Sequence, residues 1–319
     1  MLNLALVRRG CCLVLLVSVP VLAQTKAAGG SPELPPPIDF RLGVSHTFDG
    51  DLSKTDASVN RTALLGDLSY RLPSFNDKMI VTLSLSAGEL WYDFSGATTL
   101  APGTAKPWRD VTLASVGAST LYFFKHKWTG FGAVNVSYAA ENGADFGDSL
   151  TGGVAVGASY KVSDDLSVGG LLLVKTRLED DVVVIPFPTF TWKLPFDDAR
   201  RYTLNLGGSE TGSILGAGAS LSYAASDTLA VALAITGFGI GGDFRLDNDG
   251  PIPGGVGRDF SLPLIASVKW TPRPNLTLGA FGGVTLFGNV EALNSNGDHI
   301  IDRNVDPAVI VGANLSFSF

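Results

Sequence analysis

Cysteine and long apolar runs are nearly absent beyond the start of the chain. Both cysteines, Cys11 and Cys12, lie in a first segment where Arg8 and Arg9 precede an apolar run over 11–22 and Ala23 follows it. This order is typical of a secretory signal peptide, and the run is shorter than the roughly 20 residues of a membrane-spanning helix. We expect cleavage after Ala23. The mature chain then has no cysteine, which excludes disulfides, thiolate catalysis and cysteine-ligated metals.

Positive charge is also scarce. Loss of Arg8 and Arg9 leaves 21 of the 23 Lys and Arg residues against 30 Asp and Glu, a net charge of about −9. Phosphate backbones repel such a protein, so we expect no nucleic-acid partner.

Catalytic groups are few. The three histidines, His46, His126 and His299, are far apart in the sequence, and neither a Gly-x-Ser-x-Gly nor a His-Glu-x-x-His motif occurs. Gly237 to Gly242 match the spacing of a dinucleotide-binding glycine motif, but the following residues are not those of a helix. The sequence therefore predicts no enzyme and no cofactor.

The mature chain is apolar without apolar helices. Mean hydropathy is +0.26 and only 17% of residues are charged, yet no run is long enough to span a bilayer as a helix. Backbone polar groups in lipid must pair internally, which leaves a closed barrel of strands as the spanning structure.

Alternation with period two supports the barrel. Apolar residues occupy every second position in segments 154–160, 229–236 and 276–286, with small residues between them. In the last segment, Leu276, Val284 and Leu286 belong to the predicted lipid face. We expect one face toward lipid and one toward the lumen.

Connections of two kinds alternate along the chain. Six are short and rich in turn residues, and seven are variable and often long. The short ones are 72–78, 125–127, 163–165, 195–201, 225–228 and 272–275; the others are 49–60, 95–107, 140–149, 179–181, 208–211, 240–257 and 288–304. They separate about 14 antiparallel strands, or 12 because 182–194 and 201–207 alternate poorly. We expect an all-β, single-chain transmembrane β-barrel over 38–319, with a Pro-rich leader at 24–37 and both termini periplasmic.

The last strand resembles the assembly signal of bacterial outer-membrane barrels. Leu315, Phe317 and Phe319 end a run with apolar residues at alternate positions. The resemblance implies insertion into the outer membrane of a Gram-negative-type bacterium by the barrel-assembly machinery. Through Leu72-Pro73-Ser74-Phe75 and Leu194-Pro195-Phe196, the chain is also similar to uncharacterised outer-membrane barrel families.

Aromatic residues are expected to form interfacial girdles. One set lies near the short turns: Tyr70, Trp128, Tyr160, Trp192, Tyr223 and Trp270. Trp91, Tyr92 and Phe94 lie near a long connection.

The predicted lumen face is small and polar, with few bulky side chains. Its charged candidates, predicted nearer the short turns, are Lys161, Lys175, Arg177, Lys193 and Lys269. They would favour anions, or they are simply solvated.

One outer connection resembles part of a calcium loop. Asn294, Asn296, Asp298 and Asp302 place oxygens at the first, third, fifth and ninth positions, but His299 replaces the turn glycine and Val305 the bidentate acid. A weak calcium site and a solvated loop both remain open.

The sequence favours a narrow channel for passive or facilitated passage of small solutes across the outer membrane. The alternative is a non-conducting structural or surface-display barrel whose outer loops bind ions or partners.

Overall fold

The computed structural model describes residues 37–319 apart from 74–77, 97–98, 197–198, 209–217 and 237–241. The predicted signal peptide and almost all of the leader lie outside this range, as do most residues of the glycine motif. The described part consists of β-strands and one 3-10 helix: β1 (Ile38–Asp51), β2 (Ser58–Arg71), β3 (Met79–Ser95), β4 (Asp110–Phe123), β5 (Trp128–Glu141), η1 (Gly147–Ser149), β6 (Leu150–Lys161), β7 (Leu166–Arg177), β8 (Asp180–Leu194), β9 (Tyr202–Gly208), β10 (Gly218–Ala224), β11 (Leu229–Thr236), β12 (Asp243–Arg245), β13 (Val256–Arg273), β14 (Leu276–Leu293), β15 (His299–Val305) and β16 (Val309–Ser318).

No helix in the described ranges is long and apolar enough to cross a membrane.

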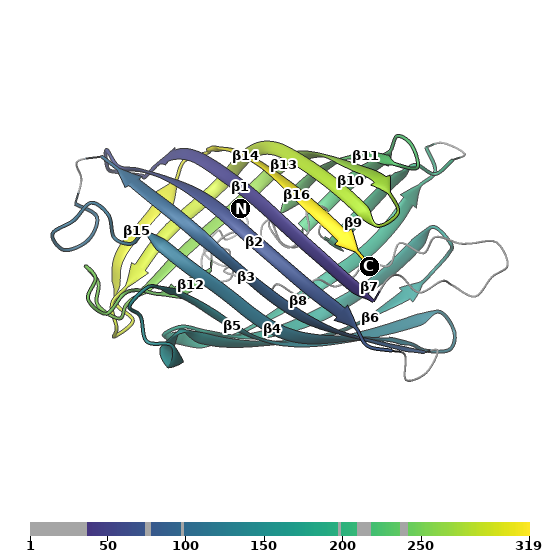
Figure 1. Cartoon of the computed structure of the whole chain (residues 1–319), viewed down its shortest axis with the longest axis horizontal. Coiled ribbons are helices and arrows are strands. Elements are labelled where there is room, and N and C mark those ends of the chain that lie inside the picture. The colour runs from purple at the N-terminus through teal and green to yellow at the C-terminus, as the bar shows by residue number, and fades with distance from the viewer. Residues whose placement is uncertain (1–36, 74–77, 97–98, 197–198, 209–217, 237–241) are drawn as a thin grey trace, which may run out of the picture.

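Fourteen of the strands form a closed antiparallel barrel (Figure 1). Neighbours in the chain pair from β1 to β11, β13 then pairs with β11 and β14, and β16 pairs with β14 and β1. β12 and β15 pair only at one end of the barrel. The predicted 14 strands are thus confirmed, including β8 and β9, which the sequence left uncertain. Pro186 and Pro188 lie within β8 in register with β7.

The strand ends that flank the six short connections lie at one end of the barrel, the turn end, and those that flank the other connections point toward the opposite end, the loop end. The two ends of the barrel chain meet at the turn end, where the Ile38 and Phe319 backbones exchange hydrogen bonds of 3.0 and 2.9 Å. The β4–β5 turn is tight because His126 and Lys127 both take left-handed φ values of 63° and 67°.

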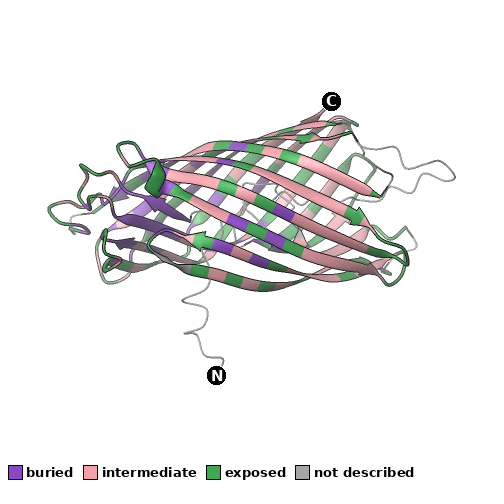
Figure 2. Cartoon of the chain, turned by 90° about the horizontal axis from the view of Figure 1, so that it is seen from below, coloured by how far each residue is buried: buried purple, intermediate pink, exposed green. Residues whose placement is uncertain are grey.

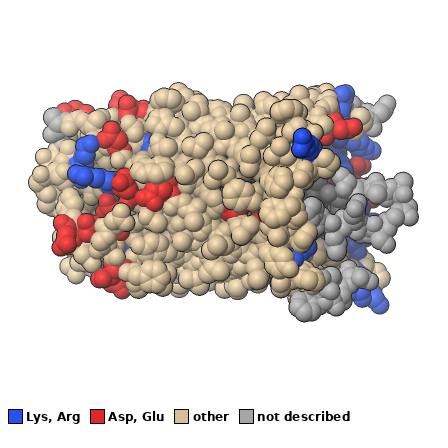
Figure 3. All heavy atoms as spheres, viewed as in Figure 1, with Lys and Arg blue, Asp and Glu red and all other residues tan. Residues whose placement is uncertain are grey.

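Each strand presents an apolar face outward. Val134 and Val136 of β5 are about half exposed, and Leu229, Val231, Leu233 and Ile235 of β11 follow the same rule. On the face of the barrel that Figure 3 shows, the middle carries almost no charge, whereas charged side chains gather toward both ends. The predicted alternation of β14 holds as far as Val284. There an extra residue, Leu286, shifts the register against β13, so that Phe287 rather than Leu286 is exposed.

A smaller ring of strands forms at the loop end. β12 pairs with β13 on one side and meets β5 through the Arg245 and Ala140 pair on the other. β15 pairs with β14 and meets the end of β1 through a bridge between Leu52 and Val305. Nine strands, β1–β5 and β12–β15, therefore close a smaller ring, which we call the outer ring. β6–β11 do not enter it.

An apolar core fills the outer ring. Trp108 lies between Phe94 and Phe244, with ring centroids 5.1 and 5.4 Å away, and Tyr92 lies 5.9 Å from Trp108 and from Phe244. All members of this core come from the ring strands and their connections, and buried residues gather at this end in Figure 2. The expectation of few bulky inward side chains is wrong here, and so is the placement of Tyr92 and Phe94 in a girdle. Trp91, which points outward, is 40% exposed.

Candidate functional site

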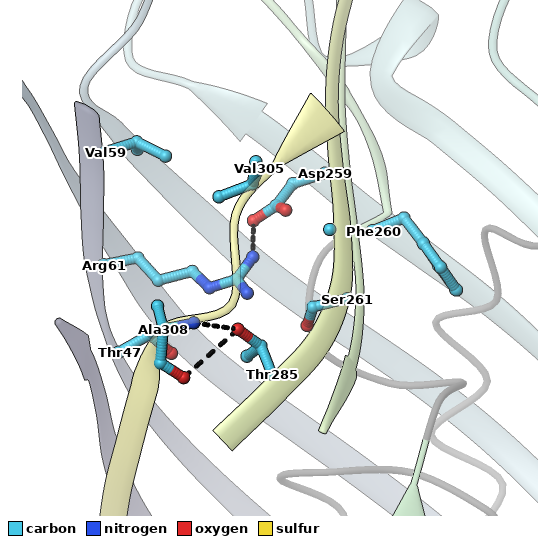
Figure 4. Close-up of a pocket in the computed structure, with 10 residues that line it drawn as sticks. Thr47, Val59, Arg61, Asp259, Phe260, Ser261, Thr285, Val305 and Ala308 are labelled. Carbon is cyan, nitrogen blue, oxygen red and sulfur yellow. Dashed lines mark hydrogen bonds and ion pairs between the residues drawn. The ribbon is translucent and has the colours of Figure 1, made fainter. Parts of the chain in front are cut away.

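A buried ion pair borders the apolar core of the outer ring on the side nearer the turn end. Arg61 of β2 binds Asp259 of β13, and the Tyr92 hydroxyl donates to the same carboxylate at 3.1 Å. A small cavity adjoins this pair, lined also by Thr47, Ser261 and Thr285 (Figure 4). We call Thr47, Arg61, Asp259, Ser261 and Thr285 the inner pocket.

The inner pocket is too small for a solute and suits about one water molecule. The Ser261 hydroxyl and the second Asp259 oxygen are buried and have no hydrogen-bond partner within the described chain, so a water there would satisfy both. Thr285 exchanges hydrogen bonds with the Ala308 backbone. The role of the inner pocket is structural: Arg61 and Asp259 join β2 to β13, and Thr285 joins β14 to the segment before β16.

A second group of charged side chains lies on the side of β12, β13 and β14 that faces away from the ring core. Arg177, the last residue of β7, holds Asp243 of β12 in a bidentate pair at 2.9 and 3.0 Å. Arg258 of β13 approaches the same carboxylate at 3.3 Å and Glu291 of β14 at 3.7 Å. Arg177, Asp243 and Arg258 are each at most 10% exposed in their side chains. We call these four residues the ion cluster.

The turn between β7 and β8 is anchored beside the ion cluster. Arg245 of β12 pairs with Glu179 at 2.8 Å and donates to the backbone oxygens of Asp148 and Gly254. Leu178 packs with Val256 and Leu293 on the same face of the ring wall. The ion pair and the apolar contacts together hold the β7–β8 turn against the side of β12 and β13 that faces away from the ring core.

Energetics favour an intact ion cluster. Breaking a buried pair by removing one partner costs about 3–5 kcal/mol, because the remaining charge stays buried without compensation. Asp243 is shared by two guanidinium groups, so its loss leaves two cations facing each other. The ion cluster is therefore a strong but reversible contact between β7 and the outer ring.

Glu141 joins two loop-end segments beyond the apolar surface of the barrel. Its carboxylate accepts from the backbone N–H groups of Arg109 at 2.8 Å and Asp247 at 3.1 Å. The segments before β4 and after β12 thus share one acceptor at the end of β5.

The predicted lumen charges lie in two places. Lys161, Lys193 and Lys269 occupy the inward positions of their strands near the turn end, and Lys161 pairs with Asp164 at 2.9 Å. Lys175 and Arg177 lie instead toward the loop end of β7, and both are largely buried, so their expected place near the short turns is wrong. Only Arg177 belongs to the ion cluster.

Sequence reasoning did not identify the other members of the ion cluster. Asp243 and Glu291 fell in segments expected to be loops. Arg258 and the inner-pocket residues Arg61 and Asp259 stood in or beside strands without a recognised motif. The one available signal was charge within otherwise apolar alternating segments.

Three of the candidate calcium residues, Asn294, Asn296 and Asp298, form the hairpin turn between β14 and β15. The Asn294 side-chain oxygen accepts from the backbone N–H groups of Asn296 and Asp298, both at 2.9 Å, and its amide donates to the Asp298 carboxylate. Asp302 lies within β15 and accepts from Asn289. Within the described ranges, no group of three or more His, Cys, Asp or Glu residues could hold a metal ion.

The residues of the predicted assembly signal lie in and directly after β16. Leu315 and Phe317 pair with Leu42 and Phe40 of β1. Phe319 is 55% exposed at the turn end, and its ring lies 5.4 Å from that of Phe317.

Comparison with known proteins finds similarity in solved structures only. No family model matches this chain, and no curated protein matches its sequence. An outer membrane channel from Pseudomonas putida F1 is 10% identical, with 92% of this chain and all of that chain covered and a TM-score of 0.44. The Ralstonia pickettii toluene transporter TbuX is 11% identical with 90% of each chain covered and a TM-score of 0.41. The KdgM porin is 11% identical, with 88% and 99% covered and a TM-score of 0.35. These values describe a resemblance in fold and carry no argument about function.

Proposed function

We propose that this chain is an exported outer-membrane barrel that passes small polar solutes through a narrow lumen. The observation that carries the proposal is the closed ring of 14 strands with apolar side chains outward and small or polar ones inward. Such a ring leaves no backbone group unpaired in hydrocarbon. The uncharged middle of the surface in Figure 3, with charges at both ends, supports a membrane position.

The turn end would face the periplasm, because bacterial barrels have short periplasmic turns and longer outer loops. Signal-peptide cleavage, the Pro-rich leader and recognition of Leu315, Phe317 and Phe319 by the barrel-assembly machinery belong to this proposal. Its partners are outer-membrane lipid and small solutes.

Lys161, Lys193 and Lys269 support a weak preference for anions. They lie at inward positions near the turn end. Field lines concentrate in a lumen with low-dielectric walls, so these charges would raise the local anion concentration.

Planar-bilayer recording tests the proposal. We expect purified barrel to give discrete current steps, with a reversal potential in a KCl gradient displaced toward that of chloride. Replacement of Lys161, Lys193 and Lys269 by glutamine should remove the displacement without abolishing the steps. Silence of folded protein at all voltages and salt concentrations would reject the channel.

The filled outer ring favours a second candidate, a non-conducting structural or surface-display barrel. Its outer loops would bind ions or partners, and Asn294, Asn296, Asp298 and Asp302 would be its weak calcium loop. Under this alternative the barrel is silent in bilayers and millimolar calcium raises its melting temperature. An unchanged melting temperature would remove the calcium loop from consideration.

A further inference from the structure

The outer ring blocks a straight path along the barrel axis. Its core contains Trp108, Phe94 and Phe244, each 1% exposed, and it takes contributions from all sides of the ring. A barrel of eight strands has an interior that side chains just fill, and nine strands enclose little more. Solutes entering within the ring would have to displace this core.

The barrel wall contains more strands than the ring, so part of the wall lies outside the ring. β6–β11 belong to the 14-stranded wall but not to the ring. The face of β12 and β13 that points away from the ring core, which we call their back face, lies against the inner side of β7, as the contact between Arg177 and Asp243 shows. Asp243, Arg258 and Arg245 on this back face are charged, whereas the ring side carries Phe244.

We propose that solutes pass the loop end behind the outer ring, along the back face of β12 and β13, and that the ion cluster is the constriction of this route. The inference rests on the proposed channel function and names the part of the barrel that performs it. In the structure the cluster closes the route, because Arg177 spans from the wall to Asp243. Passage requires this pair to separate, and guanidinium and carboxylate groups of both signs then line the path. The solutes that fit are small and polar, since an apolar molecule gains nothing from such a lining.

Asp243→Asn tests the route. The substitution removes the carboxylate that Arg177 and Arg258 share, so the two cations repel each other across the contact, which favours separation of β7 from β12. We expect the open probability in planar bilayers to rise roughly tenfold or more, with stronger anion preference, because the closed state loses a buried ion pair. Arg177→Gln, which removes the same pair from the wall side, should act in the same direction and serves if Asp243→Asn does not fold.

Asp259→Asn is the matched control. Asp259 is as buried as Asp243 and is also held by an arginine, but it faces the ring core and the inner pocket. Its replacement should leave the open probability unchanged. Slower gel migration after boiling establishes that each variant is folded before recording.

Cysteine labelling gives a readout that does not depend on current. The mature chain has no cysteine, so Lys175→Cys places a single thiol on the inner face of β7 close to the ion cluster. A charged thiol reagent should label this site faster in the Asp243→Asn background than with Asp259→Asn or neither change. If wild-type protein is silent but labelling follows this pattern, the channel function fails while the route behind the ring stands. Equal responses of the Asp243 and Asp259 variants, or no response of either readout to Asp243→Asn, overturn the route.

Discussion

Trp108 is the largest fully buried side chain in the described part of the chain, and it comes from the β3–β4 connection rather than from a strand. Its ring makes edge contacts with Phe94 and Phe244, and both aromatic neighbours belong to ring strands. Gly257 makes room for this packing, because a Cβ there would lie 2.2 Å from the Phe244 ring. The core of the outer ring thus depends on one residue of a connection.

Trp108→Ala should destabilise the barrel by about 3–5 kcal/mol, since it removes the central ring of a closed core and leaves a cavity. Urea unfolding of protein in liposomes, followed by fluorescence of the other tryptophans, measures the change. Trp128→Ala is the control. Trp128 is 47% exposed at the turn end, so its loss should cost much less. Equal costs would contradict a packed outer ring.

Each barrel strand divides its side chains between two environments. In β4, Val116 points outward between Leu85 of β3 and Val136 of β5, and 59% of it is exposed. Ser115 beside it is buried inside the barrel. This division makes the strands suited to a membrane, and it predicts that the cost of an outward charge depends on depth.

Val116→Arg should cost about 2–4 kcal/mol in liposomes, because Val116 lies in the middle of its strand and a cation there meets hydrocarbon. Val162→Arg, at an exposed position just beyond β6, should cost only about 0–1 kcal/mol because it reaches the interface. The same unfolding assay measures both. Similar values for the two variants would argue against a bilayer around the barrel.

At the scale of the whole molecule, the barrel closes only when its first and last strands meet. β1 and β16 pair over nine residue positions, from Asp39 with Ser318 to Thr47 with Ile310. Phe319 adds little packing to this seam, because more than half of it is exposed. An assembly role and a folding role of Phe319 can therefore be separated.

Phe319→Ala should lower the amount of assembled barrel in cells while purified protein still refolds in detergent with the same yield. Heat-modifiable gel migration of membrane fractions and of refolded protein measures the two quantities. Phe196→Ala, which removes another exposed phenylalanine of the turn end, is expected to change neither. A matching refolding defect for Phe319→Ala would reassign this residue to stability.

The amino-acid sequence by itself determined the barrel. Alternation with period two is a local property, and turn residues mark where each hairpin closes, so the strand number to within two and the two kinds of connection could be predicted from short segments. The limits of local pattern appeared at 240–257 and 288–304, where β12 and β15 form within expected loops and β14 runs on to Leu293.

Only the tertiary structure decided the loop end. Arg258 lies at a position of β13 whose alternation points away from the ring core, which by pattern alone means lipid, yet it is buried against Asp243. The reason is the pairing of β12 with β5 and of Val305 with Leu52, which turns the outer face of β13 toward β7. These contacts join residues more than 100 positions apart, and no local periodicity encodes them.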